Sequence, residues 1–143
     1  MIIIKEASLS KEVILRVLLD SNQDFTPPLS LSLDLNLYAE KLSNHAVFIV
    51  LKDNDNILGC LAFYTNAKEN FVYVPYFWIS HDNQKDGWGR KLFTYLVNIT
   101  NSRYKEIRLE VVKNNFNAFS FYKKNNFNVI EDRNSKYLLS RIL

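Results

Sequence analysis

The chain has 143 residues, of which 48% are hydrophobic and 23% charged, and its formal net charge at pH 7 is +3. These values are typical of one globular domain, here residues 1–143, with a sizeable core. The weak positive charge, without a run of five or six like charges, argues against a nucleic-acid partner. No apolar stretch approaches the ~20 residues that span a bilayer, so we expect no membrane association and a cytoplasmic location.

Cysteine and histidine are scarce in this sequence. Cys60 is the single cysteine, which excludes an internal disulfide, and it lies in an apolar run that predicts a buried, inert thiol. His45 and His81 have no metal-ligand spacing with each other or with Cys60. The sequence therefore predicts no metal site.

The first third of the chain predicts one strand and two helices. Residues 2–5 form a short apolar run, after which Ser8 or Ser10 can cap a helix that ends near residue 19. Polar residues and two prolines predict a loop over residues 22–32, and Asp34 can cap a second helix to about residue 42. The helical spacing predicts a buried face made of Val13, Ile14, Val17 and Leu18 in the first helix and of Leu35, Tyr38 and Leu42 in the second.

The rest of the chain predicts six strands and two helices. Apolar or alternating runs separated by polar turns predict strands over residues 46–51, 57–64, 71–80, 106–112, 127–131 and 137–142. Apolar residues at helical spacing predict helices over 88–101 and 115–124. The order is βααβββαβαββ, a mixed α/β fold with a mostly antiparallel sheet, and residues 71–112 predict one parallel strand pair.

Two of the three glycines, Gly87 and Gly89, lie in the turn between predicted strand 71–80 and the helix that follows it. Glycine lets the backbone turn sharply and approach a ligand closely, and a helix N-terminus offers unbonded N–H groups and a favourable dipole to an anion. The turn therefore predicts a phosphate or pyrophosphate site. Lys85, Arg90 and Lys91 either add positive charge there or form a solvated face.

Two common phosphate motifs do not fit this turn. A P-loop requires Gly-Lys followed by Ser or Thr, and Gly89 is followed by Arg90 and Lys91. A dinucleotide fingerprint requires a third glycine where Leu92 stands, and it opens a βαβ unit instead of following a meander. Glu106 lies at about the right distance for the ribose contact of that motif, but a single acidic residue is weak support.

A third motif fits better. The segment from Gln84 to Gly89 resembles the Gln/Arg-x-x-Gly-x-Gly/Ala signature of the GNAT superfamily of acyl-CoA-dependent N-acetyltransferases. Residues 115–127 resemble the second signature of that family, Asn-x-x-Ala-x-x-x-Tyr followed by Gly-Phe, with Asn126 in place of the glycine. Asparagine tolerates left-handed backbone, so this turn can survive the change. With the element order, the resemblance covers nearly the whole chain and implies a GNAT fold whose parallel strand pair splays apart.

The resemblance implies acetyl-CoA as co-substrate and no metal. By the family pattern, backbone N–H groups of the turn bind the pyrophosphate, Gln84 braces the loop or contacts a phosphate, and the strand before the turn contacts pantetheine and the acetyl carbonyl. Trp88 either packs beneath the helix or lies against the cofactor, and Asn115 either contacts the cofactor or caps its helix. The implied cofactor-binding residues are Phe77, Ile79, Gln84, Lys85, Asp86, Gly87, Trp88, Gly89, Arg90 and Asn115.

For the chemistry, the resemblance implies that Tyr122 is the general acid that protonates the departing thiolate. The alternative is a core aromatic residue on its helix. The proton acceptor is open, because no Asp or Glu occurs over residues 71–80. The candidates are water held by Tyr73 or Tyr76, His81, and Glu110.

The family resemblance implies transfer of an acetyl group to an amine. We expect a small acceptor, namely an amino sugar, an amino acid or a polyamine, with a protein or peptide amine and a non-catalytic acyl-CoA sensor as alternatives. The acceptor region is expected at residues 22–42, where Phe25 and Leu29 with two prolines either form an apolar lid or pack on the sheet. Asp24 or Asp34 could meet a cation there. We expect a monomer or a homodimer.

Overall fold

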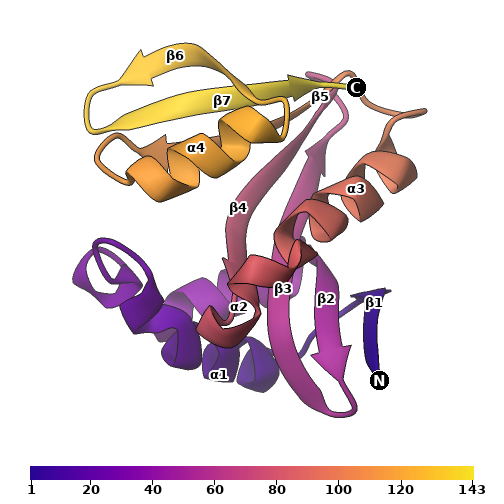
Figure 1. Cartoon of the computed structure of the whole chain (residues 1–143), viewed down its shortest axis with the longest axis vertical. Coiled ribbons are helices and arrows are strands. Elements are labelled where there is room, and N and C mark those ends of the chain that lie inside the picture. Colours follow the sequence, from indigo (N-terminus) through magenta and orange to yellow (C-terminus); the bar gives the residue numbers. More distant parts are fainter. The chain divides into compact units, whose positions relative to one another are not determined.

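The computed structural model describes residues 1–143 (Figure 1). The helices and strands follow one another as β1 (Ile2–Ala7), α1 (Lys11–Ser21), η1 (Asn22–Asp24), η2 (Leu29–Leu31), α2 (Leu35–His45), β2 (Val47–Asp53), β3 (Asn56–Asn66), β4 (Phe71–Ile79), η3 (His81–Asp86), α3 (Trp88–Thr100), β5 (Glu106–Val112), α4 (Phe116–Lys124), β6 (Asn128–Arg133) and β7 (Lys136–Ile142). The three η elements are 3₁₀ helices. The predicted order βααβββαβαββ is confirmed.

The strands form a seven-stranded mixed sheet in the order β1-β2-β3-β4-β5-β7-β6. Strand β2 pairs antiparallel with both β1 and β3, and β7 pairs antiparallel with both β5 and β6. The parallel ladder between β4 and β5 joins Phe71–Tyr73 with Glu106–Arg108. The mixed, mostly antiparallel sheet with one parallel pair is therefore confirmed. Pro75 follows this ladder by two residues and has no backbone N–H to donate to it.

The chain forms two compact units from interleaved segments. The first unit contains Met1–Phe63 and Tyr76–Phe93, and the second contains Tyr64–Pro75 and Thr94–Leu143. Strands β3 and β4 and helix α3 each give residues to both units. No helix in the structure combines the length and the apolar character needed to cross a bilayer.

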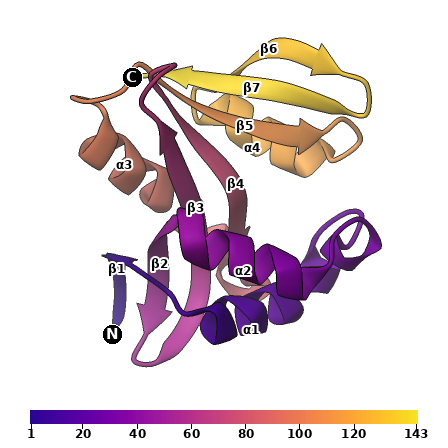
Figure 2. The same ribbon diagram turned by 180° about the vertical axis from the view of Figure 1, so that it is seen from behind.

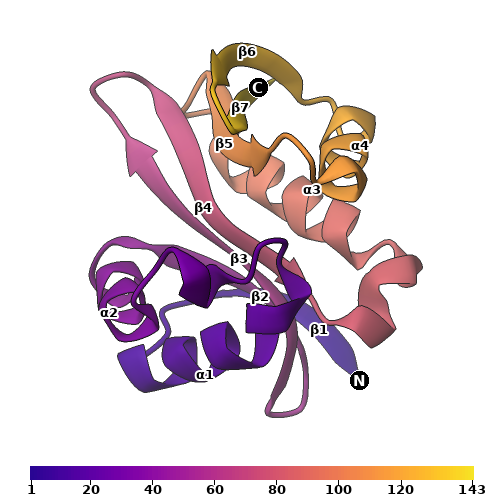
Figure 3. The same cartoon turned by 90° about the vertical axis from the view of Figure 1, so that its left-hand side faces the viewer.

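In the first unit, α1 and α2 lie side by side on one face of β2 and β3 (Figures 2 and 3). Ser10 accepts a hydrogen bond from the Val13 N–H at 3.3 Å, and Asp34 accepts one from the Leu37 N–H at 3.2 Å, so both are N-caps. The predicted helix faces are largely confirmed, with Ile14, Val17, Leu18 and Leu42 buried. Val13 is a correction: it lies at the edge of the α1 stripe and stays 40% exposed.

The predicted loop over residues 22–32 contains the two short 3₁₀ helices η1 and η2. Asn22 binds Ser30 twice: its side-chain amide donates to the Ser30 hydroxyl at 2.9 Å and its side-chain carbonyl accepts from the Ser30 N–H at 2.8 Å. Phe25 packs on Tyr76 with ring centroids 5.6 Å apart, and Leu29 also packs against the core. The loop is thus folded onto the first unit, as in one of the two predicted alternatives.

In the second unit, β5 lies between β4 and β7, and α4 covers one face of this part of the sheet (Figures 1 and 2). The alternation predicted for β5 is confirmed, because Ile107, Leu109 and Val111 are buried while the intervening residues are half-exposed. Asn126 follows α4 with a φ of 70°, and Phe127 is completely buried. Asparagine therefore takes the left-handed turn that the family signature gives to glycine.

Candidate functional site

The glycine turn has the strand–turn–helix form that the sequence predicts. Strand β4 ends at Ile79, the 3₁₀ helix η3 spans His81–Asp86, and α3 begins at Trp88. Gly87 joins them in the left-handed conformation, with φ 76° and ψ 12°. A Cβ atom at Gly87 would meet no atom within 4 Å, so the backbone angle and not the space makes glycine favourable here.

Side chains within the first unit hold this turn in shape. The Gln84 side-chain amide donates to the Ile79 carbonyl at 3.0 Å, so Gln84 braces the loop. Asn83 donates through its side chain to the Ser80 hydroxyl at 2.6 Å and through its N–H to the Ser80 carbonyl at 2.9 Å. The Ser80 N–H donates in turn to the Leu58 carbonyl of β3 at 2.8 Å. The turn is therefore tied to the end of the strand before it.

Gly59 is a structural residue that the sequence reasoning did not single out. A Cβ there would lie 2.7 Å from the Ile79 Cδ1 atom and 2.8 Å from the Trp78 carbonyl oxygen. These contacts are too short for any side chain, so β3 approaches the end of β4 closely only because residue 59 is glycine. The available signal was an isolated glycine inside a predicted strand.

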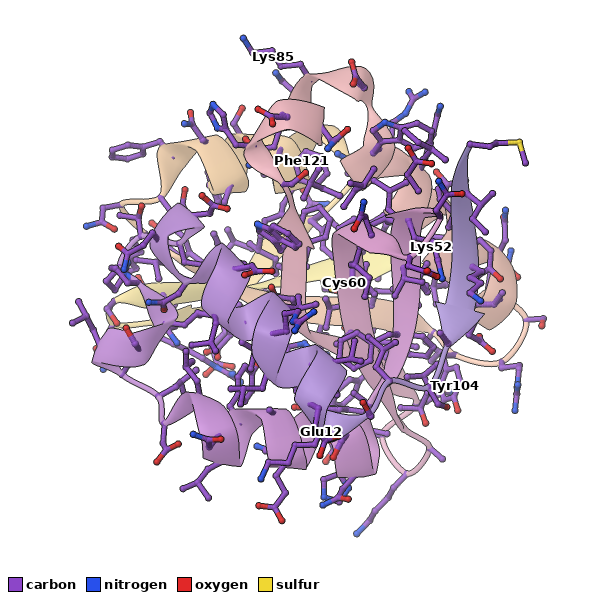
Figure 4. The ribbon with its side chains drawn as sticks, turned by 90° about the horizontal axis from the view of Figure 1, so that it is seen from below. Glu12, Lys52, Cys60, Lys85, Tyr104 and Phe121 are labelled. Atoms are coloured by element: carbon purple, nitrogen blue, oxygen red, sulfur yellow. The ribbon has the colours of Figure 1, made fainter.

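The turn places the N-terminus of α3 beside positively charged side chains. The first N–H groups of an α-helix have no partner within the helix, and its dipole favours an anion at that end. Lys85 and Arg90 are exposed, and Figure 4 shows Lys85 projecting away from the turn. The Lys91 ammonium lies 4.3 Å from the centroid of the half-buried Trp88 ring, which ties both side chains to α3. The turn suits a phosphate group chemically, with two opposing exposed carboxylates at Asp82 and Asp86.

Phe77 and Ile79 lie on β4 just before the turn. The Phe77 ring packs edge-on against Phe93 with centroids 4.9 Å apart, and the Ile79 side chain is buried. Both side chains thus serve packing. Their predicted cofactor contacts involve the backbone and remain predictions.

Tyr122 and Asn115, the predicted site residues on or next to α4, belong to the second unit. Tyr122 packs edge-on against Phe121 and Phe127, each at a centroid distance of 5.6 Å. Burial raises the pKa of the Tyr122 phenol, so the hydroxyl keeps its proton at neutral pH. The Asn115 side-chain oxygen accepts from the Ala118 N–H at 3.2 Å, which makes Asn115 the N-cap of α4.

The sequence profile of the Acetyltransferase (GNAT) family matches residues 14–127. This chain belongs to the GNAT acetyltransferase family. The match spans the glycine turn, Asn115 and Tyr122. None of the curated proteins matches the sequence.

Solved structures of GNAT proteins share the fold over their full length. An acetyltransferase from Streptococcus agalactiae superposes with a TM-score of 0.80 at 16% identity, covering 99% of this chain and 98% of its own. The PaiA N-acetyltransferase from Thermoplasma acidophilum, solved with coenzyme A, gives 0.78 at 18% identity, with 99% of both chains covered. The ribosomal-protein-S18-alanine N-acetyltransferase from Escherichia coli gives 0.75 at 18%, covering 98% and 94%. At sequence identities this low, these superpositions establish the shared fold alone.

In this GNAT protein, two of the four candidate proton acceptors are in contact. The Tyr73 hydroxyl donates to Glu110 Oε1 at 3.3 Å, and Arg133 donates to Glu110 Oε2 at 3.4 Å. The Tyr76 hydroxyl, by contrast, lies 2.6 Å from the Ser21 hydroxyl inside the core of the first unit. His81 is exposed at the start of η3.

The carboxylates predicted to meet a cation have structural partners. Asp24 accepts a hydrogen bond from the Trp78 indole N–H at 2.9 Å, and Asp34 caps α2. No three His, Cys, Asp or Glu side chains form a group that could hold a metal ion. Cys60 is fully buried, and Figure 4 labels it on strand β3.

A pocket that the sequence gave no sign of lies in the second unit. Its volume is about 540 Å³, within the range of small-molecule sites. It is lined by Tyr64, Thr65, Asn66, Ala67, Lys68, Phe71, Tyr73 and Arg133. Two of them, Tyr73 and Arg133, hold the two oxygens of Glu110.

Proposed function

We propose that this GNAT protein is an N-acetyltransferase that moves the acetyl group of acetyl-CoA directly to the amine of a small molecule, with residues 1–143 as one catalytic domain. The observation that carries the proposal is the turn before α3. Gly87 is left-handed there, Gln84 ties the loop to β4, and the helix N-terminus follows at once. A family signature in that conformation supports an anionic cofactor at this turn.

The cofactor contacts are proposed residue by residue. Backbone N–H groups of Lys85, Asp86, Gly87, Trp88, Gly89 and Arg90 bind the pyrophosphate, and the Lys85 and Arg90 side chains add positive charge. Gln84 acts by bracing the loop. The backbone of Phe77 and Ile79 contacts pantetheine and the acetyl carbonyl, and Asn115 contributes a side-chain amide in addition to its capping role. The coenzyme A in the Thermoplasma acidophilum neighbour supports acetyl-CoA as the co-substrate.

In the proposed reaction, the neutral amine nitrogen forms a bond to the acetyl carbonyl carbon, and the bond from that carbon to sulfur breaks. The amine loses one proton and the departing thiolate gains one. Tyr122 donates the proton that the thiolate gains, because its phenol is protonated at neutral pH. Tyr122 then regains a proton from solvent.

For the proton leaving the amine, we propose Glu110 as the acceptor, directly or through a water held by Tyr73. Their hydrogen bond supports the pair. The Arg133 guanidinium also donates to Glu110, at 3.4 Å, and thereby helps to fix the position of the carboxylate.

The second acceptor class is a protein N-terminus. The Escherichia coli neighbour is named for an alanine of a ribosomal protein, and it shares the whole fold. Peptides with a free N-terminus therefore belong in the acceptor panel. A non-catalytic sensor is the remaining alternative and would bind acetyl-CoA without releasing a thiol.

The test of the cofactor site is a calorimetric titration with acetyl-CoA, CoA and NAD. We expect the wild-type protein to bind acetyl-CoA and CoA and to ignore NAD. Gly89→Glu places a charged side chain at a buried position in the first turn of α3, whereas Lys85→Glu reverses an exposed charge without touching the core, so Lys85→Glu is the safer variant. Lys41→Glu, an exposed change on α2, is the matched control.

Lys85→Glu should weaken acetyl-CoA binding about tenfold, equivalent to ~1.4 kcal/mol, while Lys41→Glu leaves it unchanged. A folded wild-type protein that does not bind acetyl-CoA would overturn the acetyltransferase proposal. Undiminished binding by folded Lys85→Glu and Gly89→Glu variants would move the cofactor away from this turn.

A further inference from the structure

The pocket in the second unit has an aromatic wall. Tyr64 on β3 and Tyr73 on β4 stack with ring centroids 5.9 Å apart and an angle of 16° between their planes. Phe71 continues the wall, and the Arg108 guanidinium lies 4.3 Å from its ring centroid. Nearly parallel rings offer a flat apolar surface on which a planar group can stack.

The charge of the pocket is positive. Its charged lining residues are Lys68 and Arg133, and no acidic side chain lines it. Arg133 is neutralised by Glu110 at 3.4 Å and by Glu131 at 3.1 Å. Lys68 is exposed and makes no ion pair, so it supplies one uncompensated positive charge at the rim. The Glu110 carboxylate accepts hydrogen bonds from Tyr73 and Arg133 and does not itself line the pocket.

We propose that this pocket binds the acetyl acceptor and that the acceptor is an aromatic amine carrying a carboxylate, in the class of the aromatic amino acids. The ring stacks on Tyr64 and Tyr73, and the carboxylate meets the Lys68 ammonium. The role of the ligand as acetyl acceptor rests on the proposed function. Its binding to the pocket does not depend on catalysis. It selects among the three small-molecule classes that the sequence leaves open.

The same lining disfavours the other two classes. A polyamine is a chain of cations and finds one unpaired cation and no free carboxylate in the pocket. An amino sugar has no carboxylate for the Lys68 ammonium and no planar ring for the aromatic wall, so it matches neither feature. An aromatic ring with a carboxylate matches both features at once.

The test compares ligands that differ only in the carboxylate. Phenylalanine, tyrosine and tryptophan are titrated against phenethylamine, tyramine and tryptamine, with spermidine and glucosamine as the other two classes, all without acetyl-CoA. In the wild-type protein, at least one aromatic amino acid should bind about fivefold tighter than its decarboxylated partner, the size expected for an exposed charge pair. Lys68→Glu should invert that preference, and Lys41→Glu should leave it as in wild type.

The proposal is overturned if no aromatic amino acid binds, if spermidine or glucosamine binds more tightly, or if the preference survives Lys68→Glu. Tyr64→Ala gives an independent check, since it should weaken the acid and the amine alike by removing the stacking surface. Acetyl-CoA turnover separates this proposal from the previous one. An amino acid that binds at the pocket but is never acetylated contradicts the proposed function, whereas turnover that favours the decarboxylated amines contradicts the pocket proposal alone.

Discussion

Left-handed backbone positions in this protein are held by four asparagines and one glycine. Asn54, Asn70, Asn126 and Asn134 have φ values of 55° to 70°, and Gly87 has 76°. The short polar side chain of asparagine lowers the cost of this conformation relative to other L-residues. A chain with three glycines can therefore still build its turns, including the one after α4.

Substitutions at Gly87 should follow backbone tolerance and not size. A Cβ at residue 87 meets no atom within 4 Å. Gly87→Val therefore places a β-branched residue in left-handed backbone without a clash between its Cβ and neighbouring residues. We expect Gly87→Val to lower the free energy of unfolding by about 1–2 kcal/mol, and Gly87→Asn to cost clearly less. Urea denaturation measures both. Equal losses in the two variants would contradict the backbone account.

The two roles of Asn115 can be separated by substitution. Asp caps a helix as well as Asn does but lacks the amide donor, whereas Ala has neither function. Asn115→Asp should keep the stability of the wild type and weaken acetyl-CoA binding. Asn115→Ala should lose about 1 kcal/mol of stability as well. If Asn115→Asp binds acetyl-CoA as tightly as the wild type, Asn115 is a helix cap only.

At the scale of elements, a polar network links β5 to β7 on the half-exposed face of the sheet. Glu106 accepts hydrogen bonds from Arg108 at 2.7 Å and from the Ser140 hydroxyl at 2.8 Å. Arg108 also lies over the Phe71 ring of β4. The hydrogen bond from Arg108, followed by that from Ser140, lowers the pKa of Glu106 below its ordinary value.

This network predicts a pH dependence of stability. A carboxylate whose pKa is lower in the folded state stabilises the fold above its unfolded pKa, and that stabilisation is lost as the pH falls through the folded value. The free energy of unfolding should therefore decline below about pH 4.5, and Glu106→Gln should make the decline shallower. Glu40→Gln, an exposed change on α2, is the control. An unchanged slope in Glu106→Gln would show that the network contributes nothing to acid sensitivity.

Local chemistry made most elements predictable. The caps at Ser10, Asp34 and Asn115 and the alternation in β5 act within a few residues, so the sequence offers each of them, Ser10 as an alternative to Ser8 and the Asn115 cap as an alternative to a cofactor contact. Val13 was misplaced because a helical stripe has edges that periodicity alone does not define. The 3₁₀ helices between α1 and α2 depend on contacts such as that of Asn22 with Ser30. The amino-acid composition of the loop does not predict which of its residues form such contacts.

The candidate site divides in the same way between local and distant features. The glycine turn and the α4 motif are continuous segments, so sequence reasoning found them. The contact of Tyr73 with Glu110 joins residues 37 positions apart, and that of Glu110 with Arg133 joins residues 23 apart. The sequence offered Tyr73 and Glu110 as separate candidates, and Arg133 and the pocket were missed because they exist only once strands pair.

At the scale of the whole molecule, the predicted site residues are divided between the two compact units. The first unit holds the glycine turn with Phe77 and Ile79, and the second holds Asn115, Tyr122 and the Tyr73–Glu110 pair. The chain passes from one unit to the other after residues 63, 75 and 93, so no single cut separates them. The proposed activity therefore calls on residues of both units, and the decisive measurement has to be made on the whole chain.

That measurement is thiol release from acetyl-CoA in the presence of an amine panel, with the product mass recorded, for the wild type and for Tyr122→Phe. The panel contains aromatic amino acids, amino sugars, polyamines and peptides with a free N-terminus. We predict that the wild type acetylates at least one amine, and that Tyr122→Phe lowers kcat about 100-fold at unchanged acetyl-CoA affinity, because only the proton donor is lost. A folded wild type that binds acetyl-CoA and acetylates none of these amines would contradict the account and indicate a sensor.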